Sequence, residues 1–359
     1  MPLREQTGIV RSIAELSRWR LNELLFWTIA LMAILLFPNR YLLLTEIAWL
    51  ALFVLSLDLI LGYAGIISLG HAAFFGVGAY SAGLLALHGI ITEPVLALVA
   101  SGLAAMALGF ITSFLVLRGA DLTRLMVTLG IALLLRELAN RFSDITGGFD
   151  GLQGIVMEPV LGQFEFDLFG KTAFIYCLVV LFVMFVIARR IVHSPFGLSL
   201  RAIRNNPLRA AAIGIPVNRR LTAIYTIAAF YAGLAGALST QSTALASLDV
   251  FSFDRSADLL LVLVIGGTGY LYGGLIGAVV FKLLQDVLSS WTPQYWQFWI
   301  GLILVVLVLV GRERVHRWVV WLPDRIRDVR DARAKSVAKS AAKSVAKAGG
   351  KKPAGDARP

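Results

Sequence analysis

Ten apolar stretches, separated by shorter polar connections, dominate the sequence and restrict what the chain can fold into. Several are about 18 residues or longer, the length at which a helix crosses a hydrocarbon layer of ~30 Å. The chain is 58% hydrophobic and only 15% charged, and these values exclude an ordinary soluble domain. We therefore predict an all-α, polytopic membrane protein. The candidate spans are Leu21–Phe37, Leu42–Leu61, Ile66–Leu87, Val95–Leu117, Leu122–Ala139, Thr172–Ala188, Leu221–Leu245, Ala257–Gly267, Tyr270–Leu288 and Phe298–Val310.

Positive charge is concentrated in one connection and in the C-terminal segment. Residues 189–220 carry seven Arg, one His and no carboxylate, whereas residues 142–170 carry five carboxylates and no Lys or Arg. Because Lys- and Arg-rich connections stay in the cytoplasm, we predict that the first is cytoplasmic and the second external. Residues 311–359 hold 14 Lys and Arg against 5 Asp and Glu, whereas the preceding 310 residues hold 19 and 17. This basic tail suits contact with anionic membrane lipids, and nucleic-acid binding is not expected.

Both termini are predicted to be cytoplasmic, which requires an even number of crossings. Residues 257–288 satisfy this only as a hairpin of two helices, broken within Gly266–Gly274, where five of nine residues are Gly. Glycine is about 1 kcal/mol less favourable than alanine in a helix. The sequence thus predicts about ten transmembrane helices, with the glycine break at the cytoplasmic end. The domains are a cytoplasmic segment 1–20, a transmembrane domain 21–311 and a basic, mostly disordered cytoplasmic tail 312–359.

A second glycine-rich segment, Gly62–Tyr80, interrupts the apolar pattern. Irregular backbone survives at membrane depth only where protein or a watery cavity covers its polar groups, but Gly and Ala also let helices pack tightly. His71 is a functional-site hypothesis because it is ionisable and lies inside the membrane; alternatively it fixes helix packing through a neighbouring carbonyl. The candidates for the translocation pathway or for helix breaks are Gly65, Ser68, Gly70, His71, Gly76, Gly266, Gly267 and Gly269.

The external connection contains a turn built on Gly147, Gly148, Asp150 and Gly151. With one carboxylate among the glycines, this turn could contact an incoming substrate or a docking partner. Gly and Asp are also ordinary turn-forming residues, so a purely structural turn is the alternative.

The cytoplasmic connection is predicted to contain two short helices. The first, near Leu198–Arg204, ends ahead of Pro207 because the residue before proline avoids the α region. Asn206 can cap the second helix, Pro207 suits its first position, and Gly214 suits a left-handed closing residue. Apolar residues on a small helix flanked by Arg suit docking into a groove of another protein; the alternative is a loop held on the lipid surface. The docking residues would be Arg201, Arg204, Pro207, Leu208, Arg209, Ala211, Ala212, Ile213 and Gly214.

Four segments between Leu61 and Ala278 together resemble one family, the LivM-type permease of branched-chain amino-acid ABC importers, within the hydrophobic amino acid and urea uptake permeases. The resemblance rests on LGYAGIISLGHAAFFGVGAYSAGLL, TGGFDGLQGI, LRAIRNNPLRAAAIGIPVNRRLTAIYTIAAFYAGLAGAL and IGGTGYLYGGLIGA, which follow each other in the family's order. Two positions depart from the family pattern. Asp58 stands where Asn is common, and Arg209-Ala210-Ala211-Ala212 lacks the Glu that usually precedes the paired alanines.

The resemblance implies a permease fold like that of type II ABC importers, located in a bacterial inner membrane. It implies four kinds of partner: a second homologous permease subunit, two cytoplasmic ATPase subunits, a periplasmic substrate-binding protein and membrane lipids. It also makes Arg201–Gly214 the ATPase-coupling element. The implied function is translocation of leucine, isoleucine, valine or a related small solute. Urea and short-amide importers use sister permeases of the same pattern.

Nothing in the sequence indicates an enzyme. Gly170-Lys171-Thr172 resembles the end of a phosphate-binding loop, but Glu165 occupies the position of its required glycine. No cofactor or metal site is predicted in this chain, and ATP would bind to the partner subunits. A facilitative channel for a small solute, and an intramembrane enzyme or scaffold, are the competing classes. Few carboxylates lie deep in the spans, and the clearest are Glu46, Asp58 and Glu137; Asp258, Lys282 and Asp286 are expected near the ends of their spans.

Overall fold

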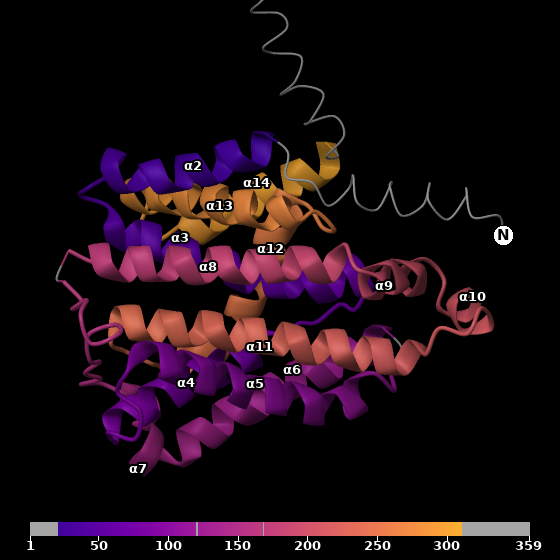
Figure 1. The fold of residues 1–359 in the computed structure, drawn as a ribbon, viewed down its shortest axis with the longest axis horizontal. Coiled ribbons are helices and arrows are strands. Elements are labelled where there is room, and N and C mark those ends of the chain that lie inside the picture. The colour runs from indigo at the N-terminus through magenta and orange to yellow at the C-terminus, as the bar shows by residue number, and fades with distance from the viewer. Residues whose placement is uncertain (1–20, 120, 168, 311–359) are drawn as a thin grey trace, which may run out of the picture. The chain divides into compact units, whose positions relative to one another are not determined.

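The computed structural model describes residues 21–119, 121–167 and 169–310, and its regular elements there are helices (Figure 1). The predicted all-α class is confirmed, since extended pairing among these residues is limited to isolated bridges. The elements are α2 (Leu21–Leu36), α3 (Tyr41–Leu57), η1 (Asp58–Gly62), α4 (Ala72–Leu87), α5 (Pro94–Val116), α6 (Asp121–Arg141), α7 (Ser143–Thr146), η2 (Gly148–Asp150), α8 (Lys171–Val192), α9 (Pro195–Asn205), α10 (Pro207–Ala212), α11 (Val217–Thr243), η3 (Leu248–Phe251), α12 (Phe253–Gly266), α13 (Leu271–Trp291) and α14 (Trp296–Val310).

Five of the described helices are long and apolar enough to cross a membrane. They are Tyr41–Gly62, Pro94–Val116, Lys171–Val192, Val217–Thr243 and Leu271–Trp291. Shorter apolar helices lie at Leu25–Leu36 and Ala72–Leu87. Each of the ten predicted spans contains a helix, but the count of ten crossings stays a prediction. The cytoplasmic termini and the basic tail also stay predictions, because they lie outside the described residues.

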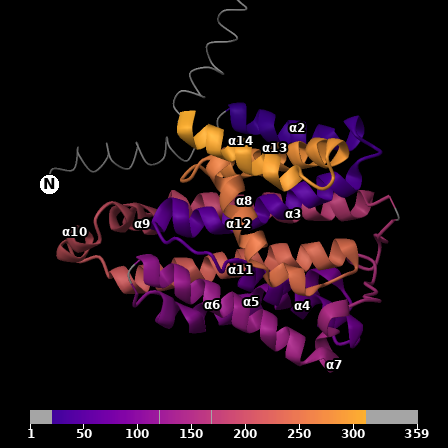
Figure 2. The same cartoon turned by 180° about the vertical axis from the view of Figure 1, so that it is seen from behind.

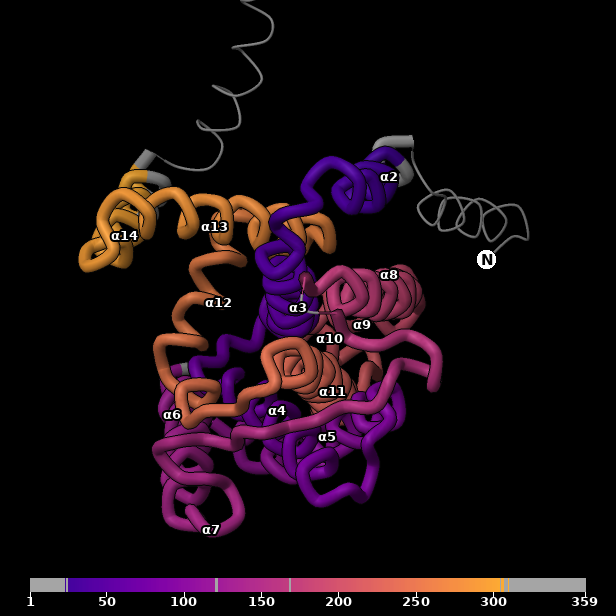
Figure 3. Tube along the Cα trace, turned by 90° about the vertical axis from the view of Figure 1, so that its left-hand side faces the viewer, coloured from indigo at the N-terminus to yellow at the C-terminus, as the bar shows by residue number. Residues whose placement is uncertain are grey.

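The chain divides into two compact units, the first ending at Trp291 and the second beginning at Thr292. In the first unit α11 packs against α5, α4 and α3, and α3 in turn packs against α8 and α13. In Figure 3 α8 and α11 are seen nearly end-on, whereas α12 crosses at a steep angle to them, as it also does in Figure 2. The connection 142–170 and the helices α9 and α10 lie at opposite ends of the unit (Figure 1). This is the separation that their opposite charge predicts. In the second unit the described part contains α14.

Small residues bring α4 and α11 into close contact in the first unit. A Cβ on Gly78 would collide with the backbone of Gly233, and a Cβ on Gly236 would collide with the carbonyl group of Phe75. A Cβ on Gly76 would likewise collide with the ring of Phe251. Backbones can approach this closely only where side chains are absent. The structure therefore supports the packing alternative for Gly76.

Apolar side chains also cover the outer faces of helices. On α5, for example, Phe110, Ile111 and Phe114 are 50%, 67% and 53% exposed, while Ala105 and Gly109 on the other face are buried. An amphipathic helix of a soluble protein would carry polar side chains on its exposed face. A helix that is apolar on both faces is suited to burial in hydrocarbon.

One predicted span boundary is wrong. The third span was expected at Ile66–Leu87, but α4 begins only at Ala72. The chain turns at Gly65, whose φ of 75° lies in the left-handed region, where glycine is favoured. Residues 66–70 that follow are irregular.

Candidate functional site

The two short helices of the 189–220 connection form through strong local signals. Asn206 Oδ1 accepts a hydrogen bond from Arg209 N at 2.9 Å, Pro207 is the first residue of α10, and Gly214 has φ 86°. These three predictions are confirmed. The first helix is longer than the predicted Leu198–Arg204, because Ser194 caps it and Pro195 begins it. Residues 189–220 therefore contain α9 and α10, joined by a sharp turn.

Most apolar residues of α10, and Ile213 directly after it, are exposed. Leu208 is 83% exposed and Ile213 is 70% exposed, and Ala211 and Ala212 are exposed beside them. Ala210, on the opposite side, is buried. The helix projects beyond the ends of the long helices in both views (Figures 1 and 2). The predicted docking residues thus form a protruding apolar tip, and docking itself stays a prediction.

The inner side of α9 is anchored on the end of α3. Arg204 Nη1 donates a hydrogen bond to the carbonyl oxygen of Gly62, and the guanidinium of Arg201 lies 5.3 Å from the centre of the Tyr63 ring. Gly62 closes a π-helical turn, η1, a type of turn that is frequent at functional sites. The connection that carries α10 therefore contacts the point where α3 ends.

The glycine-broken hairpin of α12 and α13 meets the same point. Gly269 N donates a hydrogen bond to Asp58 Oδ1 at 2.7 Å, and Asp58 is fully buried. Gly267 and Gly269 have φ values of 98° and 80°, which glycine adopts most readily. The break thus lies at the same end of the unit as α9. This arrangement agrees with the prediction that break and connection share one side, while the identity of that side stays a prediction.

The break itself is shorter than expected. It was predicted over Gly266–Gly274, but α12 continues to Gly266 and α13 already begins at Leu271. Gly273 and Gly274 lie within α13, where they allow close packing and do not form a turn. A Cβ on Gly273 would approach the carbonyl oxygens of Gly266 and Gly267. Sequence reasoning could not separate these two uses of glycine.

His71 is fully buried beside aromatic rings and one hydroxyl group. Its Nε2 is 2.8 Å from Ser56 Oγ, and its ring stacks on Phe53 with centroids 5.8 Å apart. Both His71 and Ser68 are buried, and a Cβ on Gly70 would collide with the carbonyl of Thr128. In this conformation His71 joins α3 through the Ser56 hydroxyl, whereas the packing alternative expected a neighbouring carbonyl. A role in the pathway stays a prediction that would require these helices to separate.

Hydroxyl groups from distant helices cover the irregular backbone ahead of α4. Leu69 N donates to Thr128 Oγ1 at 3.3 Å, and Ala72 N donates to Ser256 Oγ at 3.1 Å. Backbone polar groups at membrane depth need such partners because hydrocarbon offers none. Sequence reasoning missed Thr128 and Ser256, because one hydroxyl in an apolar stretch forms no recognisable pattern.

The external turn packs as a structural element. Gly147, Gly148 and Gly151 all have positive φ, between 55° and 75°. Directly after them, Leu152 N donates to Ala246 O at 2.8 Å, which joins the turn to the connection that follows α11. Asp150 is exposed. This geometry supports the structural alternative, and contact of the turn with a substrate or partner stays a prediction.

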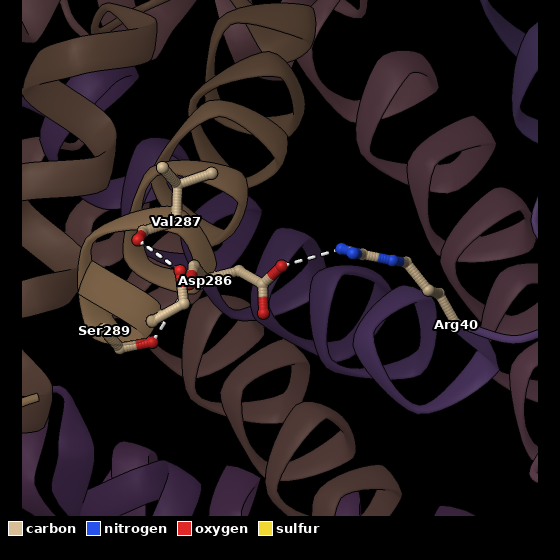
Figure 4. Close-up of polar contacts among 5 residues, drawn as sticks. Arg40, Asp286, Val287 and Ser289 are labelled. Carbon is tan, nitrogen blue, oxygen red and sulfur yellow. Dashed lines mark hydrogen bonds and ion pairs between the residues drawn. The ribbon is translucent and has the colours of Figure 1, made fainter.

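Ion pairs join helices that are distant in sequence, and sequence reasoning missed them. Arg40 Nη1 and Asp286 Oδ2 point toward one another at 2.7 Å (Figure 4). Lys282 Nζ lies 2.8 Å from Glu46 Oε2, with the Lys282 side chain only 12% exposed. Lys282 was expected near a span end, but it lies near the middle of α13, eleven residues after Leu271. The apolar residues on both sides of Lys282 were the available signal.

Several helices are long enough to cross a membrane and have apolar outer faces. The irregular backbone ahead of α4 is bonded by side chains of other helices. These features define a multi-pass membrane protein. The comparison with known families agrees with this class. The chain belongs to the family described as "Branched-chain amino acid transport system / permease component", which matches residues 39–309. The matched region runs from the start of α3 into α14 and includes the 189–220 connection.

Individual relatives are also transport permeases by name. The chain is 29% identical over 280 residues to the high-affinity branched-chain amino acid transport system permease protein LivM of Salmonella typhimurium (strain LT2), and 28% identical over 279 residues to LivM of Escherichia coli (strain K12). Both matches cover 71% of this chain and 64% of the relative. The ribose import permease protein RbsC of Bacillus subtilis (strain 168) is 29% identical over 178 residues, or 44% of this chain and 53% of that protein.

The chain therefore matches somewhat less than two thirds of the length of the LivM proteins. No solved structure matches the chain. The predicted likeness to the type II importer fold stays a prediction.

Proposed function

We propose that this chain is the membrane-spanning permease subunit of an ABC importer in a bacterial inner membrane. The observation that carries the proposal is the family match over residues 39–309, which contains both the apolar helices and the protruding α10. The importer would move branched-chain amino acids delivered by a periplasmic binding protein. The chain would bind no ATP and no other cofactor, and it would not itself be an enzyme.

The exposed tip of α10 supports partnership with an ATPase. A connection without a partner would place polar side chains outward, whereas α10 exposes Leu208 and Ile213. A short helix with apolar anchors is suited to a groove on another protein. Two cytoplasmic ATPase subunits, one for this chain and one for a second homologous permease, would complete the importer. Membrane lipids are the remaining partner, and no nucleic acid is proposed.

The substrate is inferred from the share of this chain that each relative matches. The LivM matches cover 71% of the chain, while the match to the ribose permease covers 44%. Branched-chain amino acids are therefore favoured. Urea or a short amide is the alternative substrate for the same class of importer. A facilitative channel is the alternative class, but a channel has no use for an apolar tip suited to an ATPase.

Reconstitution with the products of neighbouring genes tests this function. Two ATPases, a second permease and a secreted binding protein should co-purify with the chain and give ATP-dependent uptake of leucine. Ala211→Glu places a charge in the apolar tip and should abolish uptake while membrane insertion stays normal. Gln163→Glu adds the same charge to an exposed position at the opposite end and should leave uptake unchanged. Normal uptake in the Ala211 variant would refute docking through α10, and uptake without ATP would indicate a channel.

A further inference from the structure

Charged side chains of α12 and α13 line a small cavity in the first unit, and one of them pairs with α3. Lys282 of α13 pairs with Glu46 of α3, and its ammonium lies 6.0 Å from the centre of the Trp49 ring. Asp258 of α12 faces the same cavity as Lys282 and Trp49. The rest of the lining consists of Leu50, Phe53, Phe75, Arg255, Phe281 and Gln285.

Charged residues are rare near the middle of a membrane-spanning helix, which is where Lys282 lies in α13. Lys282 is eleven residues from the start of α13 and nine from its end, so it is close to mid-membrane in any helix that spans. Ionisable residues at that depth are costly, and they commonly mark the path of a substrate or ion. In secondary transporters, substrate sites lie near the midplane, beside interrupted helices.

Several polar atoms around the cavity lack a partner. Gln285 Oε1 and Trp49 Nε1 are buried without a hydrogen bond among the described residues. Asp258 forms no ion pair within the described part of the chain, although it interacts electrostatically with Arg255 and Lys282. Buried polar atoms are nearly always paired, so each exception needs an explanation. A bound ligand with its own donors and acceptors would supply the missing partners.

We propose that this cavity is a binding station for a zwitterionic α-amino acid with an apolar side chain. Lys282 would hold the substrate's carboxylate and Asp258 its ammonium group, while the rings of Phe53, Phe75 and Trp49 accept the side chain. This inference rests on the proposed import function and adds a substrate site to it. A neutral solute such as urea or ribose carries no pair of opposite charges. It would offer no group of opposite charge to Asp258, which forms no ion pair among the described residues.

The station is closed in this structure. The cavity has a volume of about 30 Å³, which is room for about one water molecule, so an amino acid enters only if a lining helix moves. The helix suited to move is α12, because its C-terminal end is the glycine break at Gly267 and Gly269. Gly269 is bonded to Asp58, and Arg204 of α9 contacts the adjacent Gly62. Movement of the 189–220 connection can therefore reach α12 through two hydrogen bonds.

A photoreactive leucine with a diazirine in its side chain tests the position of the station. The complete reconstituted importer is irradiated with this probe, with and without ATP, and adducts are mapped by mass spectrometry. We expect adducts within residues 49–53 or 281–285, suppressed by excess leucine but not by urea or ribose. Leucine-sensitive adducts confined to other parts of the permease would overturn the station and leave the proposed function standing. Absence of leucine uptake by the unmodified importer would overturn the function itself.

A matched pair of variants tests the charge. Asp258→Asn keeps the shape of the side chain but removes the partner of the ammonium group, and we expect labelling and leucine uptake to fall at least tenfold. Asp254→Asn makes the same change at an exposed position on α12 and should keep both within twofold of wild type. Trp49→Phe, which keeps an aromatic ring and removes the N–H group, provides a second variant if the first fails to fold; it should reduce labelling about threefold. Wild-type labelling in a folded variant of either residue would refute the proposal.

Discussion

The contact between Asp58 and Gly269 offers a sharp test of how the 189–220 connection is tied to the helix breaks. Asp58 Oδ1 accepts from Gly269 N at 2.7 Å inside the protein, and Arg204 binds the carbonyl of Gly62 at the end of the same π-helical turn. Asp58→Leu removes the acceptor while keeping a branched side chain with the same number of heavy atoms. Asp58→Asn keeps an acceptor oxygen in the same place and is the matched control, because Asn is common at this position in the family that the sequence resembles.

The expected magnitudes follow from the hydrogen bond. A buried donor left without an acceptor costs about 1–3 kcal/mol, and in Asp58→Leu that donor is Gly269 N. With Asn the bond persists. A neutral acceptor weakens it by about 1 kcal/mol, while removal of a charge that is costly to bury acts in the opposite direction. We therefore expect the Leu variant to be at least about 1 kcal/mol less stable than the Asn variant, which corresponds to a roughly fivefold shift in the unfolding equilibrium.

Two assays test this prediction. Unfolding of the purified protein in mixed micelles gives the free energy of unfolding, and ATP-dependent uptake in proteoliposomes gives function. The Leu variant should insert and bind its partners but lose most uptake, because the glycine break is no longer tied to the turn that α9 contacts. The Asn variant should keep most of its uptake. Equal stability of the two variants, or full uptake by the Leu variant, would show that this contact does not matter.

Three further predictions concern the tail, the topology and helix packing. A stop codon at Ala332 should leave uptake near wild type, because the Lys-rich tail has almost no apolar residues to pack; loss of uptake at normal expression would contradict this. With the native cysteine replaced by serine, Asp254→Cys and Gln294→Cys should both react with an impermeant external reagent, and protection of the second alone would mean a single crossing between them. Gly78→Val should destabilise the protein by at least about 1–3 kcal/mol through overpacking, measured by unfolding in micelles. Gly130→Ala is the control, as a Cβ there has no heavy atom within 4 Å.

Local signals were predictable from the sequence, and contacts between distant segments were not. Asn206, Pro207 and Gly214 lie within nine residues, and their chemistry alone specifies a cap, a helix start and a left-handed end. The pair formed by Glu46 and Lys282 joins residues 236 apart, and the bond between Asp58 and Gly269 joins residues 211 apart. One sequence shows which polar residues lie within apolar stretches, but the packing of the helices decides which of them meet.

The same limit applies to glycine. It occurs both in turns and at close helix contacts, and the sequence alone does not distinguish the two. Gly267 and Gly269 provide a turn, as predicted, and their positive φ values show why glycine is needed. Gly76 and Gly78 lie inside α4, where they allow a ring or a backbone to approach. The hydrophobic pattern could not separate these uses, since all four glycines interrupt apolar stretches. It placed the third span six residues too early for the same reason, because Ile66 and Ile67 are as apolar as the helix that follows.

The features found by sequence and those found only by structure converge on α12. Ser256 near its start binds the backbone of Ala72, next to His71. Asp258 lies two residues further on at the charged cavity, and the glycine break ends the helix beside Asp58. A tilt of α12 would release the Ser256 contact and open the cavity together, and the break is the place that permits it. Interfaces that are packed without gaps switch between discrete arrangements and do not deform gradually. Under the proposed function, docking at the tip of α10 would act on this break through Arg204 and Asp58, and it would favour either the closed arrangement seen here or an open one.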